Sequence, residues 1–379
     1  MLKKALLLCI TVVCLYGCTS KKDKKQVSER DASGTDTKNI EDKFVGLHTH
    51  IPEWLKTYNV PSVSVTVIEN GKIVWSAVHG KQSPNRKAND KTLYLTASIA
   101  KPVTAEIFLR LASLGKVDLD EPMAKYWLDP DISGDPRALL LTPRHVLTHR
   151  TGFKNWRRMT DGVLRFERDP GTDMGYSGEG MQYLVRFIEK KLNRPFNDIA
   201  QELLFDPTGM TNSALARQEW YEGRLAWPLF PDGEWQEPRS REEALGAGGM
   251  HTTSDDYAKF MISVMNNEGV SSKLRREQFE ISQNQIDDCL ESATLPNACP
   301  SRLGFGLAWY VYEFEDGRIV SHSGANSGER TLAIFAPKSS SGLVVMTNGA
   351  NGNHVIYKIA EEVGVHKDFI AIEKPKADN

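Results

Sequence analysis

The stretch Ser98-Ile99-Ala100-Lys101 opens an apolar helical pattern that runs to about Leu114. Pro102 is tolerated only in the first turn of a helix, so Ser98 is expected near the N-terminal end. Positions i and i+3 of a helix share a face, which places Lys101 beside Ser98. A serine nucleophile needs a neighbouring base, and burial near the positive end of a helix favours a neutral lysine amine. The stretch therefore predicts a serine nucleophile activated by a lysine.

Taken alone, this spacing is a weak signal. The other interpretation of Ser98 is a helix cap that is followed by a solvated lysine. A second match, Ser113-Leu114-Gly115-Lys116, lies where the helical pattern ends at a glycine. Because that serine lacks the free N–H groups of a helix start, we expect the second match to be structural.

Patterns typical of β-hairpins lie near both ends of the chain. Residues 62–67 alternate with period two, Asn70-Gly71 is a favoured two-residue turn, and residues 72–75 return. Further strands are predicted over residues 307–314, 318–322, 331–335 and 343–347. Helical patterns dominate between roughly residues 97 and 270, and a last helix is expected after Asn353. The order predicts an α+β fold in which both ends of the chain complete one antiparallel sheet around an inserted helical lobe.

Four further motifs follow Ser98-x-x-Lys101 in order: Leu140-Leu141-Thr142-Pro143-Arg144-His145-Val146-Leu147-Thr148-His149-Arg150-Thr151-Gly152, Tyr176-Ser177-Gly178, Ala247-Gly248-Gly249-Met250-His251-Thr252-Thr253-Ser254-Asp255-Asp256 and His322-Ser323-Gly324. Their order and spacing, over about residues 45–350, resemble those of the penicillin-recognising serine hydrolases. The branch is the one that holds class C β-lactamases, D-alanyl-D-alanine carboxypeptidases and related esterases. The resemblance implies a β-lactamase/penicillin-binding-protein-like fold and acyl-enzyme chemistry without a metal or cofactor.

The resemblance also implies roles for individual residues. Ser98 attacks the substrate carbonyl and becomes acylated, while Lys101 takes its proton or holds the charge while another group does. Tyr176 matches the tyrosine that shuttles a proton to the leaving group and helps to activate water. Such a tyrosine works well when a nearby cation lowers its pKa, and Lys101 is the candidate cation.

The last motif matches the Lys-Thr-Gly strand that lines the far wall of the family's site. His322 takes the place of the lysine, and Ser323 and Gly324 follow it along the strand. Gly324 is expected to let the backbone approach the substrate closely. The backbone N–H of Ala325 is then the second oxyanion donor, paired with the N–H of Ser98. His149 and the pair Gly248-Gly249 are expected to be structural.

Two departures from the family pattern point away from efficient penicillin hydrolysis. Gly178 stands where the family usually has an asparagine that contacts the substrate's acyl amide. His322 is mostly neutral at pH 7, so it is a weaker partner for the penicillin carboxylate than lysine. The expected activity is therefore hydrolysis of an ester or amide by an esterase, peptidase or carboxypeptidase-like enzyme, with weak or absent β-lactamase activity. Trp156, Arg157 and Arg158 are candidates for the mouth of the site.

Other classes of protein fit the sequence less well. An α/β-hydrolase needs Gly-x-Ser-x-Gly, and the nearest match, at residues 175–179, ends in glutamate. A zinc hydrolase with His-Glu-x-x-His is excluded at His145 because Val146 follows it. The remaining alternative is a penicillin-binding-like cell-wall sensor that acylates slowly, although Ser98, Lys101 and Tyr176 are all present.

The N-terminus predicts export and lipid anchoring. Lys3 and Lys4 precede a short apolar run, and Leu15-Tyr16-Gly17-Cys18 resembles the lipobox of bacterial lipoproteins. We therefore expect a signal peptide over residues 1–17, acylation at Cys18 and a flexible tether over residues 18–40. The predicted location is the bacterial cell envelope, on the periplasmic side of a membrane or at the cell surface.

Composition bounds the remaining organisation. The 379 residues carry a formal net charge of −2, which gives no field that would recruit nucleic acid. We expect one catalytic domain over residues 41–370, with a helical lobe at about residues 115–240 and a tail over residues 371–379. Cys289 and Cys299 are expected to form a disulfide in an oxidising compartment. The expected partners are a small-molecule or peptide substrate with an ester or amide bond, and a membrane.

Overall fold

The computed structural model describes residues 33–292 and 295–377. The chain divides into two units, residues 1–39 and 40–379, and the second unit holds all of the features below. Its α-helices and β-strands, of which the first begins in the preceding unit, are α1 (Ser33–Thr57), β1 (Ser62–Glu69), β2 (Lys72–Ser83), β3 (Arg86–Lys87), β4 (Tyr94–Leu95), α2 (Ala100–Ser113), α3 (Pro143–Leu147), α4 (Gly178–Leu192), α5 (Phe196–Ala200), α6 (Asp206–Thr208), β5 (His251–Thr252), α7 (Ser254–Met265), α8 (Ser272–Gln278), α9 (Ile286–Ser292), β6 (Arg302–Phe305), β7 (Tyr310–Glu313), β8 (Arg318–Ala325), β9 (Arg330–Ala336), β10 (Ser341–Thr347), α10 (Gly352–Val363) and α11 (Lys367–Ala377). Short 3₁₀ helices and one π-helix, η6, are η1 (Ala97–Ile99), η2 (Met123–Lys125), η3 (Pro130–Ile132), η4 (Pro136–Leu140), η5 (Arg157–Thr160), η6 (Gln201–Phe205), η7 (Glu219–Tyr221) and η8 (Pro296–Ala298).

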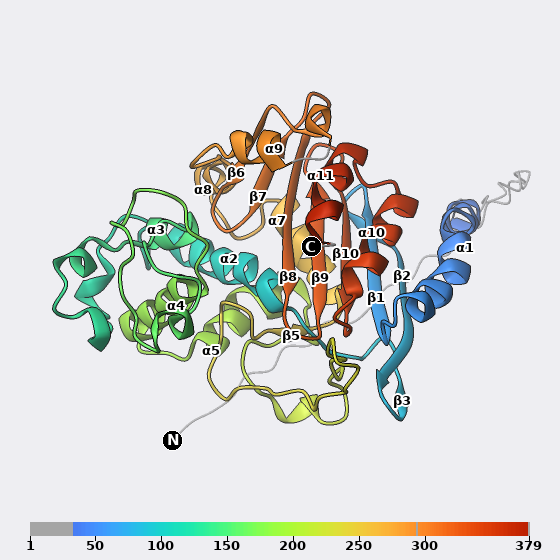
Figure 1. Cartoon of the computed structure of the whole chain (residues 1–379), viewed down its shortest axis with the longest axis horizontal. Coiled ribbons are helices and arrows are strands. Elements are labelled where there is room, and N and C mark those ends of the chain that lie inside the picture. Colours follow the sequence, from blue (N-terminus) through green and yellow to red (C-terminus); the bar gives the residue numbers. More distant parts are fainter. Residues whose placement is uncertain (1–32, 293–294, 378–379) are drawn as a thin grey trace, which may run out of the picture. The chain divides into compact units, whose positions relative to one another are not determined.

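One antiparallel sheet of eight strands, in the order β3-β2-β1-β10-β9-β8-β7-β6, organises the second unit. The hairpin β1–β2 pairs with β10, so a strand from the N-terminal part of the described chain and one from its C-terminal part lie side by side in the sheet, as predicted (Figure 1). The α+β class and the β-lactamase-like antiparallel architecture are therefore confirmed.

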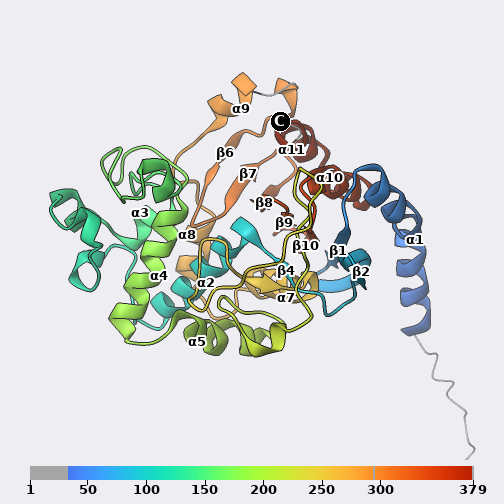
Figure 2. The same ribbon diagram turned by 60° about the horizontal axis from the view of Figure 1, so that its bottom comes forward.

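Alternation along the strands gives the sheet two buried faces. Val63, Val65 and Val67 of β1 pack with apolar residues of α1, α10 and α11. The intervening Ser64 and Thr66 face the opposite way, where their hydroxyl groups hydrogen-bond to Ser254 Oγ at the start of α7 (both 2.7 Å). Helices α2 and α7 cover this second face (Figure 2). Their apolar residues belong to the larger hydrophobic cluster.

Helix α2 is buried along almost its whole length. Glu106, which has no exposed surface, accepts hydrogen bonds from Arg275 Nη1 and Nη2 at 2.7 and 2.9 Å and from Arg110 Nε at 3.1 Å. Since a buried carboxylate is stable only when it is paired, these bonds fix α2 against α8. The helix that follows the predicted nucleophile is thus held rigidly.

The inserted region differs in part from the predicted helical lobe. Helices α3 to α6 lie between β4 and β5, within the expected range of residues 115–240. Beyond Met210, however, the described chain to Met250 is irregular apart from η7. This segment is held by isolated contacts, such as the bond from Leu93 N to Arg224 O (2.8 Å). Helical structure was expected there, but the segment is polar and contains Gly and Pro residues, which favour turns.

Three other boundaries were predicted wrongly. The strand expected over residues 307–314 is interrupted because Ala308 has a φ of 63° and Gly306 N donates to Trp309 O (2.9 Å). Residues 371–377 belong to helix α11 rather than to a tail, and Ile372 is only 2% exposed. Helix α1 begins at Ser33, inside the predicted tether of residues 18–40.

The expected disulfide is present. Cys289 in α9 and Cys299 after η8 are bonded, with their Cα atoms 6.1 Å apart. The predicted signal peptide and the acylated Cys18 lie outside the described residues. Across residues 33–292 and 295–377, the helices are too short or too polar to cross a bilayer.

Candidate active site

Ser98 lies in the 3₁₀ turn η1, one turn before α2, close to its predicted place at a helix start. The preceding residue, Ala97, is 6% exposed and has a φ of 47°. A left-handed conformation costs a residue with a Cβ about 1–2 kcal/mol, so the surrounding packing must hold this turn in place. The strained turn presents Ser98 to an open pocket, while Lys101 remains inside.

Lys101 is fully buried and contacts the predicted nucleophile. Its Nζ is 3.0 Å from Ser98 Oγ and donates a hydrogen bond to Ala247 O at 2.7 Å. Burial lowers the pKa of Lys101 from 10.5 to about 7, because the protein interior solvates an ammonium ion poorly. Near neutral pH a large share of the amine is therefore unprotonated, and the same 3.0 Å contact allows Nζ to accept the Ser98 proton.

Tyr176 reaches the same oxygen from the segment just before α4. Its hydroxyl interacts with the Ser98 side chain, and Lys101 Nζ lies 4.8 Å from the centre of its ring. Burial raises the pKa of Tyr176 above 10, and the interaction with Ser98 opposes this only in part. The expectation that Lys101 lowers the pKa of this tyrosine is therefore wrong, since desolvation is the larger effect. At neutral pH Tyr176 is a phenol that can donate a proton and accept another.

His322, on β8, lies behind these groups rather than in the open pocket. It is 2% exposed, and its ring is 6.1 Å from the ring of Tyr176. Its Nδ1 donates to Ser323 O (2.7 Å), while Nε2 is buried without a hydrogen-bond partner among the described residues. Burial, with a smaller contribution from Lys101, lowers the pKa of His322 to about 3. The imidazole is therefore neutral and is not a cationic clamp for a carboxylate.

Gly324 is the point at which β8 touches the nucleophile segment. A Cβ at this residue would lie 2.5 Å from Thr96 O and 3.0 Å from Ser98 N. Thr331 Oγ1, from β9, donates to the same Thr96 oxygen at 2.8 Å. Gly324 therefore approaches the protein's own nucleophile turn closely, while its approach to a substrate stays a prediction.

Strand β8 next supplies Ser323 and Ala325, both exposed, and Ala325 and Ser98 both line the pocket. The two predicted oxyanion donors are therefore on the wall of one pocket.

Gly178, which replaces the family's asparagine, makes room for a tryptophan. A Cβ at this glycine would lie 2.6–2.9 Å from carbon atoms of the Trp156 indole. The backbone of Gly178 is fixed by Asn155 Oδ1, which accepts its N–H at 2.9 Å. Trp156 thus takes space that a side chain at residue 178 would need, and Trp156, Arg157 and Arg158 all line the pocket.

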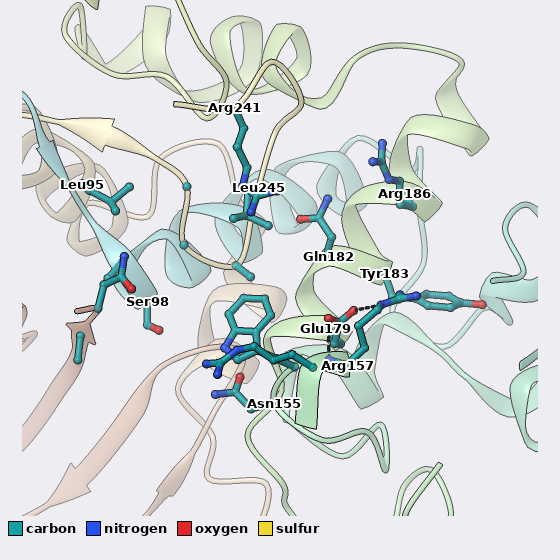
Figure 3. Close-up of a pocket in the computed structure, with 18 of the residues that line it drawn as sticks. Leu95, Ser98, Asn155, Arg157, Glu179, Gln182, Tyr183, Arg186, Arg241 and Leu245 are labelled. Atoms are coloured by element: carbon teal, nitrogen blue, oxygen red, sulfur yellow. Dashed lines mark hydrogen bonds and ion pairs between the residues drawn. The ribbon is translucent and has the colours of Figure 1, made fainter. Parts of the chain in front are cut away.

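The pocket has a volume of about 930 Å³, within the range of small-molecule sites. In Figure 3, Ser98 lies on one side, and Glu179, Gln182, Tyr183 and Arg186 follow α4 on the other. The complete lining is Leu95, Ala97, Ser98, Trp127, Asp129, Asn155, Trp156, Arg157, Arg158, Glu179, Gln182, Tyr183, Arg186, Arg239, Arg241, Leu245, Ala247, Gly248, Gly249, Ala325, Asn326 and Ser327.

Sequence reasoning did not select several of these residues. Asn155 lies between the second and third motifs, just before the predicted mouth residues Trp156, Arg157 and Arg158. Arg239 and Arg241 belong to the irregular segment that was predicted to be helical. The sequence around these two arginines, Pro-Arg-Ser-Arg, is typical of any exposed loop and does not by itself indicate a binding site.

Two sequence features proved structural, as expected. Ser113 of the second Ser-x-x-Lys match donates to Leu109 O (2.8 Å) at the end of α2. His149 is buried, and its Nδ1 accepts the N–H of Ser177 (3.2 Å). The ring of His149 packs 4.4 Å from that of Tyr176, so it supports the position of the tyrosine.

The fold and this juxtaposition of serine, lysine and tyrosine define a class of protein, the serine hydrolases. The chain belongs to the beta-lactamase family, whose model matches residues 39–362.

Similar known proteins include "Unguisins hydrolase ungD" of Aspergillus violaceofuscus, which is 23% identical over 357 residues. This match covers 82% of the chain but only 63% of the fungal protein's length. The D-alanyl-D-alanine-carboxypeptidase/endopeptidase AmpH of Escherichia coli K12 is 21% identical over 310 residues, 75% of this chain and 78% of AmpH.

Solved structures show the same fold. The D-alanine carboxypeptidase AmpC of Burkholderia cenocepacia superposes with a TM-score of 0.69 at 19% identity, over 86% of this chain and 98% of that one. The octameric penicillin-binding protein homologue of Pyrococcus abyssi gives a TM-score of 0.67 at 21% identity, over 84% and 77%.

The contact at Gly324 predicts the effect of one added methyl group. In Gly324→Ala the Cβ would meet Thr96 O at 2.5 Å and push β8 away from Ser98. We expect the second-order rate constant for labelling Ser98 by a fluorophosphonate to fall on the order of 10- to 100-fold, the cost of misplacing reacting groups by about 1 Å. Gly134→Ala is the control, since nothing lies within 4 Å of that Cβ. Equal labelling of both variants would contradict this account of β8.

The buried amine predicts a pH dependence. Lys101 accepts a proton only when it is neutral, and its pKa is about 7, so labelling should be lost as the pH falls. We expect the labelling rate to rise about tenfold per pH unit below 7 and to level off above it. Lys101→Arg, which stays charged, should label poorly at every pH. A wild-type rate that is equal at about pH 5.5 and 9 would refute the role of a neutral lysine.

Proposed function

We propose that this protein hydrolyses an ester or a small amide through an acyl-enzyme on Ser98. The observation that carries the proposal is the desolvated Lys101 amine, 3.0 Å from Ser98 Oγ, with the Tyr176 side chain beside the same two residues. A nucleophile within reach of a base of matched pKa is the arrangement that acyl transfer requires.

Acylation would proceed as follows. Ser98 Oγ gives its proton to Lys101 Nζ and forms a bond to the substrate carbonyl carbon, whose π electrons move onto oxygen. The backbone N–H groups of Ser98 and Ala325 are the candidate donors to that oxyanion. When the intermediate collapses, the bond to the leaving group breaks, and Tyr176 passes that group a proton which Lys101 replaces.

Deacylation would reverse these roles. A water molecule gives a proton to the Tyr176–Lys101 pair and attacks the acyl carbon, and Ser98 Oγ leaves and regains its proton. A neutral Tyr176 suits this relay because it can donate and accept in the same step. His322 is neutral and buried, so it would support the Tyr176–Lys101 pair from behind and would not bind a charged group of the substrate.

Two features of the site and the names of the similar proteins support one class of substrate. Trp156 fills the space beside Gly178, and His322 offers no positive charge for a penicillin carboxylate. Both features support weak or absent β-lactamase activity. The names of the similar proteins, a hydrolase and a carboxypeptidase/endopeptidase, support an amide or ester substrate.

The site would operate in the cell envelope, with the chain anchored by a lipid on Cys18. The lipobox-like Leu15-Tyr16-Gly17-Cys18 supports this location. So does the Cys289–Cys299 disulfide, since such bonds persist in oxidising compartments. Labelling with a fatty-acid analogue in a bacterial host, with Cys18→Ser beside the wild type, tests the anchor.

The activity is tested on residues 33–379 by intact mass after treatment with a fluorophosphonate. We expect one adduct on the wild type and none on Ser98→Ala. A 4-nitrophenyl ester should be hydrolysed on the order of 10³-fold faster by the wild type than by Ser98→Ala or Lys101→Ala. Ser113→Ala is the matched control, because it alters the second Ser-x-x-Lys match and leaves the site intact.

A labelled penicillin distinguishes the possible substrates. We expect slow or no reaction with it. A stable penicillin adduct would point instead to a cell-wall peptidase, and rapid turnover to a β-lactamase. A wild type that takes up neither probe would contradict the enzymatic proposal and favour a cell-wall sensor.

A further inference from the structure

The pocket beside Ser98 carries more positive charge than its own acids neutralise. Its lining includes five arginines and two acids. The arginines are Arg157, Arg158, Arg186, Arg239 and Arg241. The acids are Asp129 and Glu179.

Both acids are already paired with one of these arginines. Arg157 Nη2 is 3.1 Å from Asp129 Oδ2, and Arg157 Nε is 3.1 Å from Glu179 Oε2, as the dashed lines to Glu179 in Figure 3 illustrate. Arg157 also reaches Asp131 at 3.0 Å. Arg157 therefore stabilises the wall of the pocket. Because it pairs with both acids, neither carboxylate is free to repel a bound anion.

Arg186, on α4, is also paired. It contacts Glu189 at 3.0 Å and, by a second ion pair, Glu243. Arg158, Arg239 and Arg241 are different, because each is exposed and none has an ion pair within residues 33–292 and 295–377. Three unpaired guanidinium groups thus come from two separate segments, η5 and the loop before Leu245, to one pocket that also holds Ser98.

We propose that the substrate carries a carboxylate that these three arginines bind while its scissile carbonyl lies at Ser98. Guanidinium groups bind carboxylates with two parallel hydrogen bonds, and unpaired ones need no internal partner to be displaced first. Trp127, Trp156 and Leu245 add apolar wall beside them, which suits an acyl or peptide chain between the scissile bond and the charge. This inference rests on the proposed function and specifies its substrate class.

The test compares anionic esters with neutral counterparts of the same acyl length and the same position of the nitro group. Mono-4-nitrophenyl adipate carries a carboxylate on its acyl group, and 4-nitrophenyl hexanoate is its neutral counterpart. A third ester, 3-hexanoyloxy-4-nitrobenzoate, carries the carboxylate on the leaving group, and 2-nitrophenyl hexanoate is its neutral counterpart. For the wild type we expect kcat/KM for at least one anionic ester to exceed that for its neutral counterpart at least tenfold, with a preference that falls as salt is added.

Substitutions assign the preference to the arginines. In Arg158→Gln/Arg239→Gln/Arg241→Gln we expect the anionic-to-neutral ratio to fall at least tenfold, with each single variant between the wild type and the triple variant. The ratio does not depend on the fraction of active protein, so partial unfolding cannot imitate the result. Arg276→Gln is the control, since Arg276 is exposed, has no ion pair among the described residues and lies outside the pocket.

Two outcomes would overturn the proposal. One is a ratio at or below unity for both anionic esters, and the other is a ratio that the triple variant leaves unchanged. If no ester is hydrolysed, the proposed function is wrong, but the role of the arginines can still be tested. The affinities of Ser98→Ala for the anionic and neutral esters are then compared. Equal affinity of that variant for the adipate and hexanoate esters would refute the role of the arginines.

Discussion

An ammonium group at Lys101 Nζ would have to give up its hydration shell, and the oxygen atoms that contact it in the described chain are Ser98 Oγ and Ala247 O. Three donors facing two acceptors in an interior without solvent favour the neutral amine. The lysine is buried because α2 is enclosed on nearly every side and fixed through Glu106. The chemistry of the site therefore begins in the packing of one helix.

The groups around this amine come from distant parts of the chain. Tyr176 precedes α4, Ala247 belongs to the irregular segment before β5, and Gly324 brings β8 to within contact of Ser98. The central sheet makes this possible because its C-terminal strands lie beside the N-terminal hairpin. One added methyl group at Gly324 of β8 is therefore expected to displace Ser98, although residue 324 takes part in no chemical step itself.

The parts of the site that could be predicted from sequence are those in which local geometry decides the outcome. The i, i+3 spacing on a helix was enough to pair Ser98 with Lys101, and alternation was enough to predict most strands. The raised pKa of Tyr176 could not be predicted, because it depends on how much protein surrounds the ring. Nor could the Trp156 indole beside Gly178, or the presence of Arg158 and Arg241 on the wall of one pocket, since each brings together segments without a common period.

Direct titration of Lys101 tests the central claim most closely. Protein labelled with ¹³C at the lysine ε carbon would be followed by NMR between about pH 5 and 11, with Lys101→Arg used to assign the resonance. The account predicts that this lysine titrates near pH 7, well below the ordinary lysine value of about 10.4. A midpoint for Lys101 near about 10 would mean that the amine is charged at neutral pH, and would contradict its role as the base for Ser98.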